Sequence, residues 1–411
     1  MTSPLADLLR SLRGFNYRVW AAGAFVSNVG TWVQRTAQDW LVFTQLTEHD
    51  ASAVGLVMAL QFAPQLLLLP WTGFAADHFN QRKLLIATQA AMGGLALVLG
   101  VLTVTGLVQL WHVYVFAFLF GCAAAFDAPV RQTFVSELVG DEDLHNAVAL
   151  NSTSFNAAQV IGPAVSGLVI TATGTGWAFL INGTSFVAVL ISLAFLRIVE
   201  LHPNARAERG KGSFIEGLHY VWARPDLKAI LLMLFLIGTF GLNYPIYIST
   251  MAVDVFHVDA RGYGLLSSMM AIGTMTGGLV GAAVNKLRFS LLLIGTSVFG
   301  FGFTLAAFAP SYWFFGGALV IIGMAALTFT NTTNSLMQLS TEPVMRGRVM
   351  ALRVGIGLGG TPIGAPIVGW VANQFGPRWA LGIGAASGIT AAIVAILALT
   401  RQDKISPPDP L

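Results

Sequence analysis

A short segment near the N-terminus places an acid and a base inside an otherwise apolar stretch. In SNVGTWVQRTAQDW, Asn28, Trp32, Arg35 and Asp39 follow one another at intervals of four, three and four residues, so they share one face of a helix. A carboxylate inside a membrane is costly to bury, and it usually serves to bind a proton or a charged solute. The spacing also allows Arg35 to pair with Asp39.

Two interpretations of this pair stay open. Asp39 could titrate, exchanging Arg35 for a proton or for a cationic substrate. Alternatively, the two residues form a fixed bridge near the outer interface, where Trp40 indicates the depth of the lipid headgroups. A histidine relay is not expected, because all 7 histidines fall in loops or at the ends of apolar segments.

The composition is that of an integral membrane protein. Of 411 residues, 55% are hydrophobic and 10% are charged, whereas a soluble domain has about 25% charged residues. The single cysteine, Cys122, excludes an intrachain disulfide and a cysteine-based metal site. The net charge of +3 comes from basic residues in short loops, which favours membrane topology and argues against a nucleic-acid partner.

A helix needs about 20 mostly apolar residues to cross a bilayer, and the sequence predicts twelve such spans. They lie near residues 18–44, 52–76, 84–106, 111–130, 147–172, 177–197, 228–253, 262–285, 289–309, 312–335, 348–373 and 378–400. Of the 22 Lys and Arg residues, all but Arg35, Arg261 and Arg378 then fall on the N-terminal side of the membrane. Both termini are therefore expected in the cytoplasm.

The two halves of the chain resemble each other. With a shift of 202 residues, Ala149 matches Ala351 and Gly162 matches Gly364. We therefore expect an all-α membrane protein of two six-helix pseudo-repeats, which is typical of transporters. The expected divisions are an amphipathic N-terminal segment on the cytoplasmic surface (1–17), an N-terminal bundle (18–197), a cytoplasmic linker (198–227), a C-terminal bundle (228–400) and a cytoplasmic tail (401–411).

Two motifs resemble those of the major facilitator superfamily, and the resemblance covers essentially the whole chain. GFAADHFNQRK is similar to the superfamily's loop between spans two and three, keeping Gly73, Asp77, Arg82 and Lys83. It departs from that pattern at His78, Asn80 and Gln81. VIGPAVSG resembles the motif of the antiporters in this superfamily, with Gly162, Pro163 and Gly167 in place. The drug and siderophore exporter branch is the most similar.

The resemblance implies a conformational latch on the cytoplasmic side, made by Gly73, Asp77, Arg82, Lys83, Asp127 and Arg131. Asp77 would accept backbone N–H groups at the start of span eleven. Arg82 and Lys83 would lie among lipid phosphates or pair with Asp127. The structural alternative is an ordinary positively charged inner loop.

The antiporter-like motif implies a tight interface that prevents ions from leaking between the halves. Pro163 removes a helix hydrogen bond, and the two glycines permit close packing, so span five should bend. A generic kink is the alternative, since kinks are common in membrane helices.

Polar side chains within the spans are candidates for substrate binding, although many could simply join helices. They are Gln38, Gln61, Asn151, Asn156, Gln159, Asn243, Tyr244, Tyr247, Asn331 and Asn334. A cavity with so few charges suits a bulky amphipathic solute better than a sugar phosphate.

The sequence thus predicts a proton-coupled exporter of drugs or siderophore-like molecules in a bacterial inner membrane, acting by alternating access. Its expected partners are the small-molecule substrate, protons and membrane lipids, and we expect a monomer that is not an enzyme. No cofactor is expected, because the proton gradient supplies the energy and no phosphate-binding GxxxxGK[ST] loop occurs. An importer or facilitator, and less favoured, a non-transporting sensor or scaffold, remain as alternatives.

Overall fold

The computed structural model describes residues 10–202, 214–283 and 289–405, which are helical throughout with short connections and contain no strand. The chain divides into two compact units. Unit 1 comprises Met1–Glu48, Leu60–Arg209 and Asp259–Ser268, and unit 2 comprises His49–Ala59, Gly210–Val258 and Met269–Leu411. Each unit therefore contains a short segment that lies far from the rest of it in sequence.

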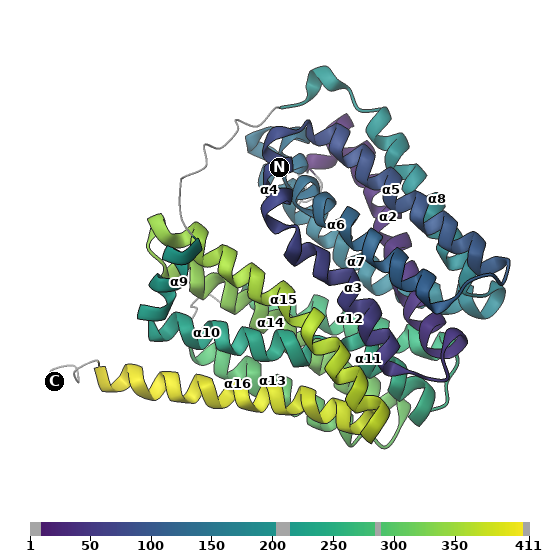
Figure 1. Ribbon diagram of the computed structural model, residues 1–411. Helices are drawn as coiled ribbons and strands as arrows, with labels where there is room; N and C mark the ends of the chain where they lie inside the picture. Colours follow the sequence, from purple (N-terminus) through teal and green to yellow (C-terminus); the bar gives the residue numbers. More distant parts are fainter. Residues whose placement is uncertain (1–9, 203–213, 284–288, 406–411) are drawn as a thin grey trace, which may run out of the picture. The chain divides into compact units, whose positions relative to one another are not determined.

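Unit 1 is built on long helices that pack lengthwise. The helix α5 runs along α8, and α2 packs against α7 and α8 (Figure 1). Its elements are η1 (Arg10–Arg13), α2 (Phe15–Leu41), η2 (Val42–Leu46), α4 (Leu69–His78), α5 (Gln81–Val104), α6 (Leu110–Leu138), α7 (Asp141–Thr173), α8 (Thr175–Ala194) and η3 (Ile198–Glu200), with the second part of α3 (Ala51–Leu67) and the first part of α12 (Ala260–Ala283). Small residues such as Ser185 and Ser192 on α8 let α2 approach closely.

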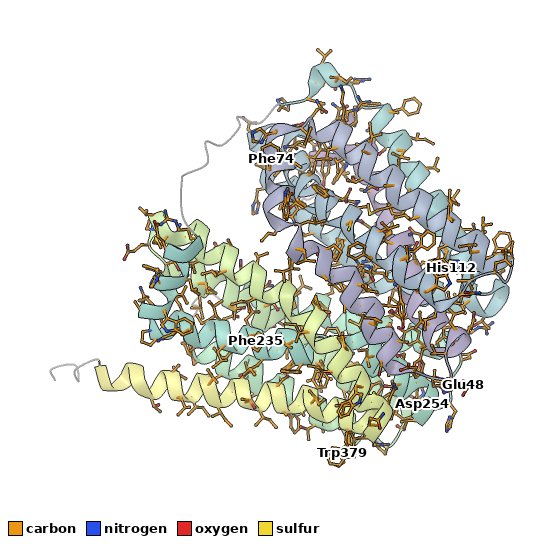
Figure 2. All side chains as sticks on the ribbon, in the orientation of Figure 1. Glu48, Phe74, His112, Phe235, Asp254 and Trp379 are labelled. Carbon is orange, nitrogen blue, oxygen red and sulfur yellow. The ribbon has the colours of Figure 1, made fainter. Side chains whose placement is uncertain are left out.

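Unit 2 repeats this plan, with α13 packed against α14 and α16 (Figure 1). Its elements are α9 (Phe214–Ala223), α10 (Pro225–Leu236), η4 (Ile237–Gly241), α11 (Tyr244–Thr250), η5 (Met251–Val255), α13 (Ser290–Ala307), α14 (Tyr312–Ser340), α15 (Pro343–Phe375) and α16 (Pro377–Ile405), with the remaining parts of α3 and α12. In Figure 2, Asp254 and Trp379 lie near one end of this unit and Phe235 lies about halfway along it.

The helix bounds repeat with the shift that the sequence predicts. The bounds of α6 and α7 recur 202 residues later as those of α14 and α15. The turns that end α7 and α15 also match, because Gly174 and Gly376 both adopt a left-handed backbone, with φ of 93° and 95°. Glycine has no Cβ to oppose this conformation, so it ends both helices sharply.

The same symmetry applies to the short segment that each unit contains from a distant part of the sequence. In unit 1, a Cβ added at Gly264 would lie 2.3 Å from the carbonyl oxygen of Pro163, and one at Gly167 would lie 2.6 Å from that of Ala260. In unit 2, a Cβ added at Gly55 would lie 2.4 Å from the oxygen of Ala365. The equivalent addition at Gly369 would lie 2.4 Å from the oxygen of Ala51. Backbone thus packs directly on backbone at equivalent places in both units.

Most predicted spans are confirmed as long apolar helices. Ten helices among the described residues are long and apolar enough to cross a membrane. The two other predicted spans correspond to α2 and to α3 followed by α4, where Leu68 interrupts the helix. The number twelve therefore stays a prediction. The seventh predicted span is not one regular helix, because Leu242 and Asn243 interrupt the helix between η4 and α11.

Two segments lie outside the predicted spans. Residues 214–223 of the expected linker form the helix α9, whereas residues 203–213 lie outside the described part of the chain. In the expected surface segment, residues 1–9 lie outside the description, but residues 10–13 pack on α7. Arg10 pairs with Asp143, and the Ser11 hydroxyl donates a 2.7 Å hydrogen bond to Asn146. Polar partners on α7 therefore hold η1 against the protein.

The backbone contacts at Gly167 and Gly369 predict the effect of a single added methyl group. Gly167→Ala and Gly369→Ala should each destabilise the protein by about 1–3 kcal/mol, because a helix backbone would have to shift. Gly382→Ala should have no such effect, since a Cβ there meets nothing within 4 Å. Thermal unfolding of purified protein in lipid nanodiscs measures all three. Equal midpoints for Gly167→Ala and Gly382→Ala would contradict this packing.

Candidate functional site

Asp39 lies close to the end of α2 and is buried, with 8% of its surface exposed. Its Oδ2 atom lies 3.5 Å from the hydroxyl oxygen of Tyr263, which is long for a bond that the hydroxyl donates. Tyr263 is itself buried and stacks on Trp40, with ring centroids 5.6 Å apart. Asp39 is therefore buried, and no short hydrogen bond to its carboxylate is found among the described residues.

The predicted pairing of Arg35 with Asp39 is not found. No ion pair or hydrogen bond of Arg35 exists among the described residues, and its buried Nε has no partner. The guanidinium instead lies 5.1 Å from the ring centre of Trp32 and 5.9 Å from that of Phe62. These cation–π contacts hold the guanidinium against rings from α2 and α3.

A second buried carboxylate, Asp127 on α6, is fully partnered. Its Oδ2 accepts from Nε and a terminal nitrogen of Arg131, at 2.9 and 2.8 Å. Its Oδ1 accepts from the Thr88 hydroxyl at 2.8 Å and from the Gln89 amide at 2.6 Å. Arg131 also donates to Asn28 at 3.1 Å. This network joins α2, α5 and α6 within unit 1.

The network corrects two sequence-based expectations. Asn28 shares a helix face with Asp39, but its side chain binds Arg131 in a different cluster. Asp127 pairs with neither Arg82 nor Lys83, because α5 presents Thr88 and Gln89 to it instead.

The remaining latch residues lie around the turn between α4 and α5. The Arg82 Nε donates a hydrogen bond of 2.8 Å to the carbonyl oxygen of Leu193, and this bond joins the start of α5 to the end of α8. Lys83 has an exposed side chain, and its backbone N–H is capped by Asn80 at 3.0 Å. Gly73 is partly buried on α4, and the side chain of Asp77 lies outside the described residues. The structure thus shows Arg82 joining two helices of unit 1.

The antiporter-like motif lies where α7 is most closely packed. A Cβ added at Gly162 would lie 2.3 Å from the Cβ of Trp32 on α2. Pro163 and Gly167 contact residues 260–264 of α12 through the backbone. Pro163 lies inside α7, which continues to Thr173. The motif therefore brings α2 and the start of α12 against α7 within unit 1.

The substrate candidates in unit 1 fall into two groups. Gln38 and Gln61 are buried and lie 3.4 Å apart, so they join α2 to α3. Asn151, Asn156 and Gln159 on α7 are partly buried, and no hydrogen bond of their side chains is found among the described residues.

Asn151 and Gln159 flank Phe155, which is 46% exposed and meets the ring of Trp32 edge-on at 6.0 Å. All three positions are spaced by four residues on α7, so they share a face. We call Trp32, Phe62 and Phe155, together with Arg35, the aromatic face of unit 1.

The candidates in unit 2 differ in their contacts. The Asn243 amide donates a hydrogen bond of 2.7 Å to the carbonyl oxygen of Thr239. The Tyr247 hydroxyl donates a hydrogen bond to the carbonyl oxygen of Phe240. These bonds satisfy carbonyl groups at the helix break, as expected where a membrane helix is interrupted. The buried hydroxyl of Tyr244 has no partner among the described residues. Asn331 is exposed and Asn334 is partly buried on α14.

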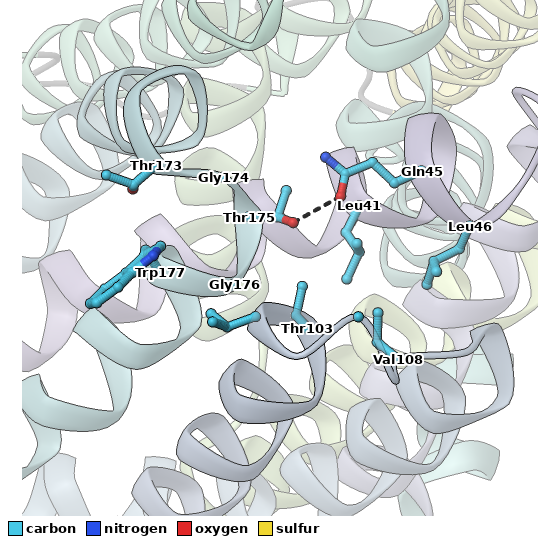
Figure 3. Close-up of a pocket in the computed structure, with 12 residues that line it drawn as sticks. Leu41, Gln45, Leu46, Thr103, Val108, Thr173, Gly174, Thr175, Gly176 and Trp177 are labelled. Carbon is cyan, nitrogen blue, oxygen red and sulfur yellow. Dashed lines mark hydrogen bonds between the residues drawn. The ribbon is translucent and has the colours of Figure 1, made fainter.

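A pocket of about 530 Å³ opens in unit 1 where α2, α5 and α7 end and α8 begins (Figure 3). Its lining carries no charged residue, and the Thr175 hydroxyl donates to Gln45 at 2.9 Å across it. Leu41 lines this pocket, but none of the predicted site residues does. A space of this size with uncharged walls fits the end of an amphipathic molecule.

Several residues of these clusters were not predicted from the sequence. Tyr263, Phe62, Thr88 and Gln89 each act through a partner that is distant in sequence. In unit 2, His49 lies 2.9 Å from Asp254, and Asn373 binds Ser52 and Asp50. In the sequence, the available signal for Tyr263 was the pair of glycines that flank it in RGYG, Gly262 and Gly264.

Comparison with known proteins assigns the family. The family described as transmembrane secretion effector, within the major facilitator superfamily, matches residues 2–407. The chain belongs to this family. The resemblance seen in the sequence is thereby confirmed, and the chain is a multi-pass membrane transporter. The fold agrees: a bacterial homologue of the human lysosomal transporter Spinster superposes with a TM-score of 0.74 at 15% identity, covering 99% of this chain and 100% of that one.

Several similar proteins have names that describe the transport of siderophores or drugs. The chain is 24% identical to the staphyloferrin A transporter of Staphylococcus aureus, over 86% of this chain and 89% of the relative. It is 24% identical to macrolide efflux protein A of Streptococcus pyogenes, over 88% and 90%. It is 23% identical to the enterobactin exporter of Escherichia coli, over 86% and 84%.

The network around Asp127 predicts a large loss of stability when one partner is removed. Asp127→Asn should destabilise the transporter by about 3 kcal/mol or more, because Arg131 would keep a buried charge without its counterion. Arg197→Gln provides the control. It removes an ion pair with Glu200 whose side chains are 58% and 50% exposed, so it should cost less than about 1 kcal/mol. Unfolding with sodium dodecyl sulfate in mixed micelles measures both, and similar losses would contradict the network.

Proposed function

We propose that this protein is a proton-coupled exporter that moves amphipathic small molecules, such as drugs or siderophores, out of a bacterial cell. The observation that carries this proposal is the contrast between two buried carboxylates. Asp127 accepts four hydrogen bonds, so both of its oxygens are held by donors. Asp39 has one long contact with Tyr263, so neither of its protonation states is locked by its surroundings.

A carboxylate of this kind suits proton coupling in a membrane carrier. Burial makes the charged form costly, while the nearby positive charge of Arg35 limits that cost. Because Arg35 is not bound to Asp39, the carboxylate can take up a proton without first breaking an ion pair.

The aromatic face of unit 1 supports an amphipathic substrate. The rings of Trp32, Phe62 and Phe155 offer apolar surface, and Asn151 and Gln159 offer amide groups that bind nothing else among the described residues. Tyr244 adds an unpartnered hydroxyl in unit 2. The names of the siderophore and macrolide carriers among the relatives agree with this class of substrate.

Several finer points of the proposal rest on the sequence. Transport would proceed by alternating access of two six-helix bundles joined by the linker, with both termini in the cytoplasm and the protein a monomer in the inner membrane. The basic residues on the N-terminal side support this orientation. The cytoplasmic latch would be formed by Gly73, Asp77, Arg82 and Lys83. Asp127 and Arg131 would be a fixed part of unit 1 rather than partners of the latch. Membrane lipids would surround the apolar outer faces of the helices.

Replacement of Asp39 tests the proposal. Asp39→Asn should reduce efflux driven by a pH gradient to the level of empty vesicles, because an amide cannot carry a proton. The measurement uses inverted vesicles and a panel of ethidium, a macrolide and an iron-chelating catechol, with and without a protonophore. Accumulation in inverted vesicles also establishes the export direction.

Asp254→Asn is the matched control for this experiment. Asp254 lies in η5 beside His49 and is partly exposed, so its loss should leave proton-driven transport intact. Full pH-driven transport by Asp39→Asn, or an equal loss in both variants, would refute the assignment of Asp39.

A further inference from the structure

The first turns of α12 join Asp39 to the antiporter-like motif. Tyr263 faces Asp39 and stacks on Trp40. The next residue, Gly264, contacts the carbonyl group of Pro163. The Ser268 hydroxyl donates a hydrogen bond of 2.7 Å to the carbonyl oxygen of Val160. One short segment, residues 260–268, therefore touches the buried carboxylate on α2 and the close-packed stretch of α7.

The polar part of this contact departs from the internal symmetry. The backbone contacts of residues 260–264 recur in unit 2, where residues 51–55 pack on α15 in the same way. The position equivalent to Tyr263 is Val54, which is buried and has no hydroxyl to donate. A phenol at this place is thus not needed for the packing that both units share.

We propose that Tyr263 is a positioning residue that makes the docking of residues 260–268 depend on the protonation of Asp39. The ionised carboxylate accepts from the phenol and holds the segment against α2 and α7. The protonated carboxyl is a weaker acceptor, so the segment is released more often. Because α12 continues from this segment into unit 2, proton uptake acts on a helix that both units share.

The geometry suits a reversible contact. At 3.5 Å, the bond is longer than the about 2.7–2.8 Å typical of a hydroxyl donor, so it holds weakly and can be broken at low cost. Among the described residues, the charged or titratable groups that act on Asp39 are Arg35 on α2 and Tyr263 on α12.

This inference rests on the proposed role of Asp39, and it can be tested without a substrate. Hydrogen exchange of peptides covering residues 259–268 is measured by mass spectrometry in nanodiscs at mildly acidic and mildly alkaline pH, after correction for intrinsic rates. In the wild-type protein, protection should fall about fivefold at the acidic pH, as expected when a charge-assisted bond becomes a neutral one. Asp39→Asn and Tyr263→Phe should both abolish this pH dependence.

Tyr17→Phe is the matched control. Tyr17 is also buried in unit 1, but its hydroxyl donates 2.7 Å to the carbonyl of Ala147 and not to a carboxylate. This variant should keep the pH dependence of the wild-type protein. Retention of the pH dependence in Tyr263→Phe, or its absence in the wild-type protein, would overturn the inference.

The two proposals fail in different experiments. If Asp39→Asn keeps proton-driven efflux, the proposed function falls, whatever the exchange data show. If Asp39→Asn loses that efflux while protection of residues 259–268 is independent of pH in the wild-type protein, Asp39 still carries the proton and only the role of Tyr263 is wrong. The wild-type and Asp39→Asn measurements decide this even if Tyr263→Phe does not fold.

Discussion

A polar group inside a bilayer must find its partner within the protein, because lipid offers neither a donor nor an acceptor. Most of the buried polar groups of this chain obey that constraint. Asp127 is surrounded by donors from α5 and α6, and Asn243 and Tyr247 satisfy carbonyl groups where the helix breaks. Asp39, a buried carboxylate whose contact with Tyr263 is long, departs from that pattern, and this departure supports the proposal that Asp39 carries the proton.

The scaffold around Asp39 is symmetric, but the site is not. The two halves share helix bounds, the glycine turns after α7 and α15, and the backbone contacts that bind residues 51–55 and 260–264 to those helices. These shared features fix how closely the helices pack. The chemistry lies in the differences: an acid near the end of α2 and a phenol at the start of α12. This asymmetry supports the proposal of a single proton site at Asp39.

The sequence predicted the elements that depend on local patterns. Apolar length predicted ten spans that the structure contains, and the recurrence of Gly162 as Gly364 predicted a shift that the helix bounds follow. The break at Leu242 was missed because the stretch is long and apolar enough to be interpreted as one span, although Gly241, Asn243 and Pro245 lie there. The helix α9 was missed because its ten residues are too few to span a bilayer and were counted with the polar linker.

Partners of the site residues could not be predicted in this way. Spacing placed Asn28, Trp32, Arg35 and Asp39 on one face, which is correct for their helix but says nothing about what packs against each turn. Arg131 is bound to Asn28, aromatic rings attract Arg35, and Tyr263 reaches Asp39. Each of these partners is set by how close-packed helices bring distant parts of the chain together. Only that packing separates an exchangeable carboxylate from a structural one.

Infrared difference spectroscopy of the purified transporter tests the central claim most directly, because it detects the protonated carboxyl group itself. As the pH is raised from mildly acidic to mildly alkaline values, the wild-type protein should lose a carboxyl band that is absent from Asp39→Asn. The same band should persist in Asp127→Asn, since this substitution leaves the Asp39 carboxyl group in place. A titrating band that is unchanged in Asp39→Asn, or that disappears in Asp127→Asn instead, would contradict the account.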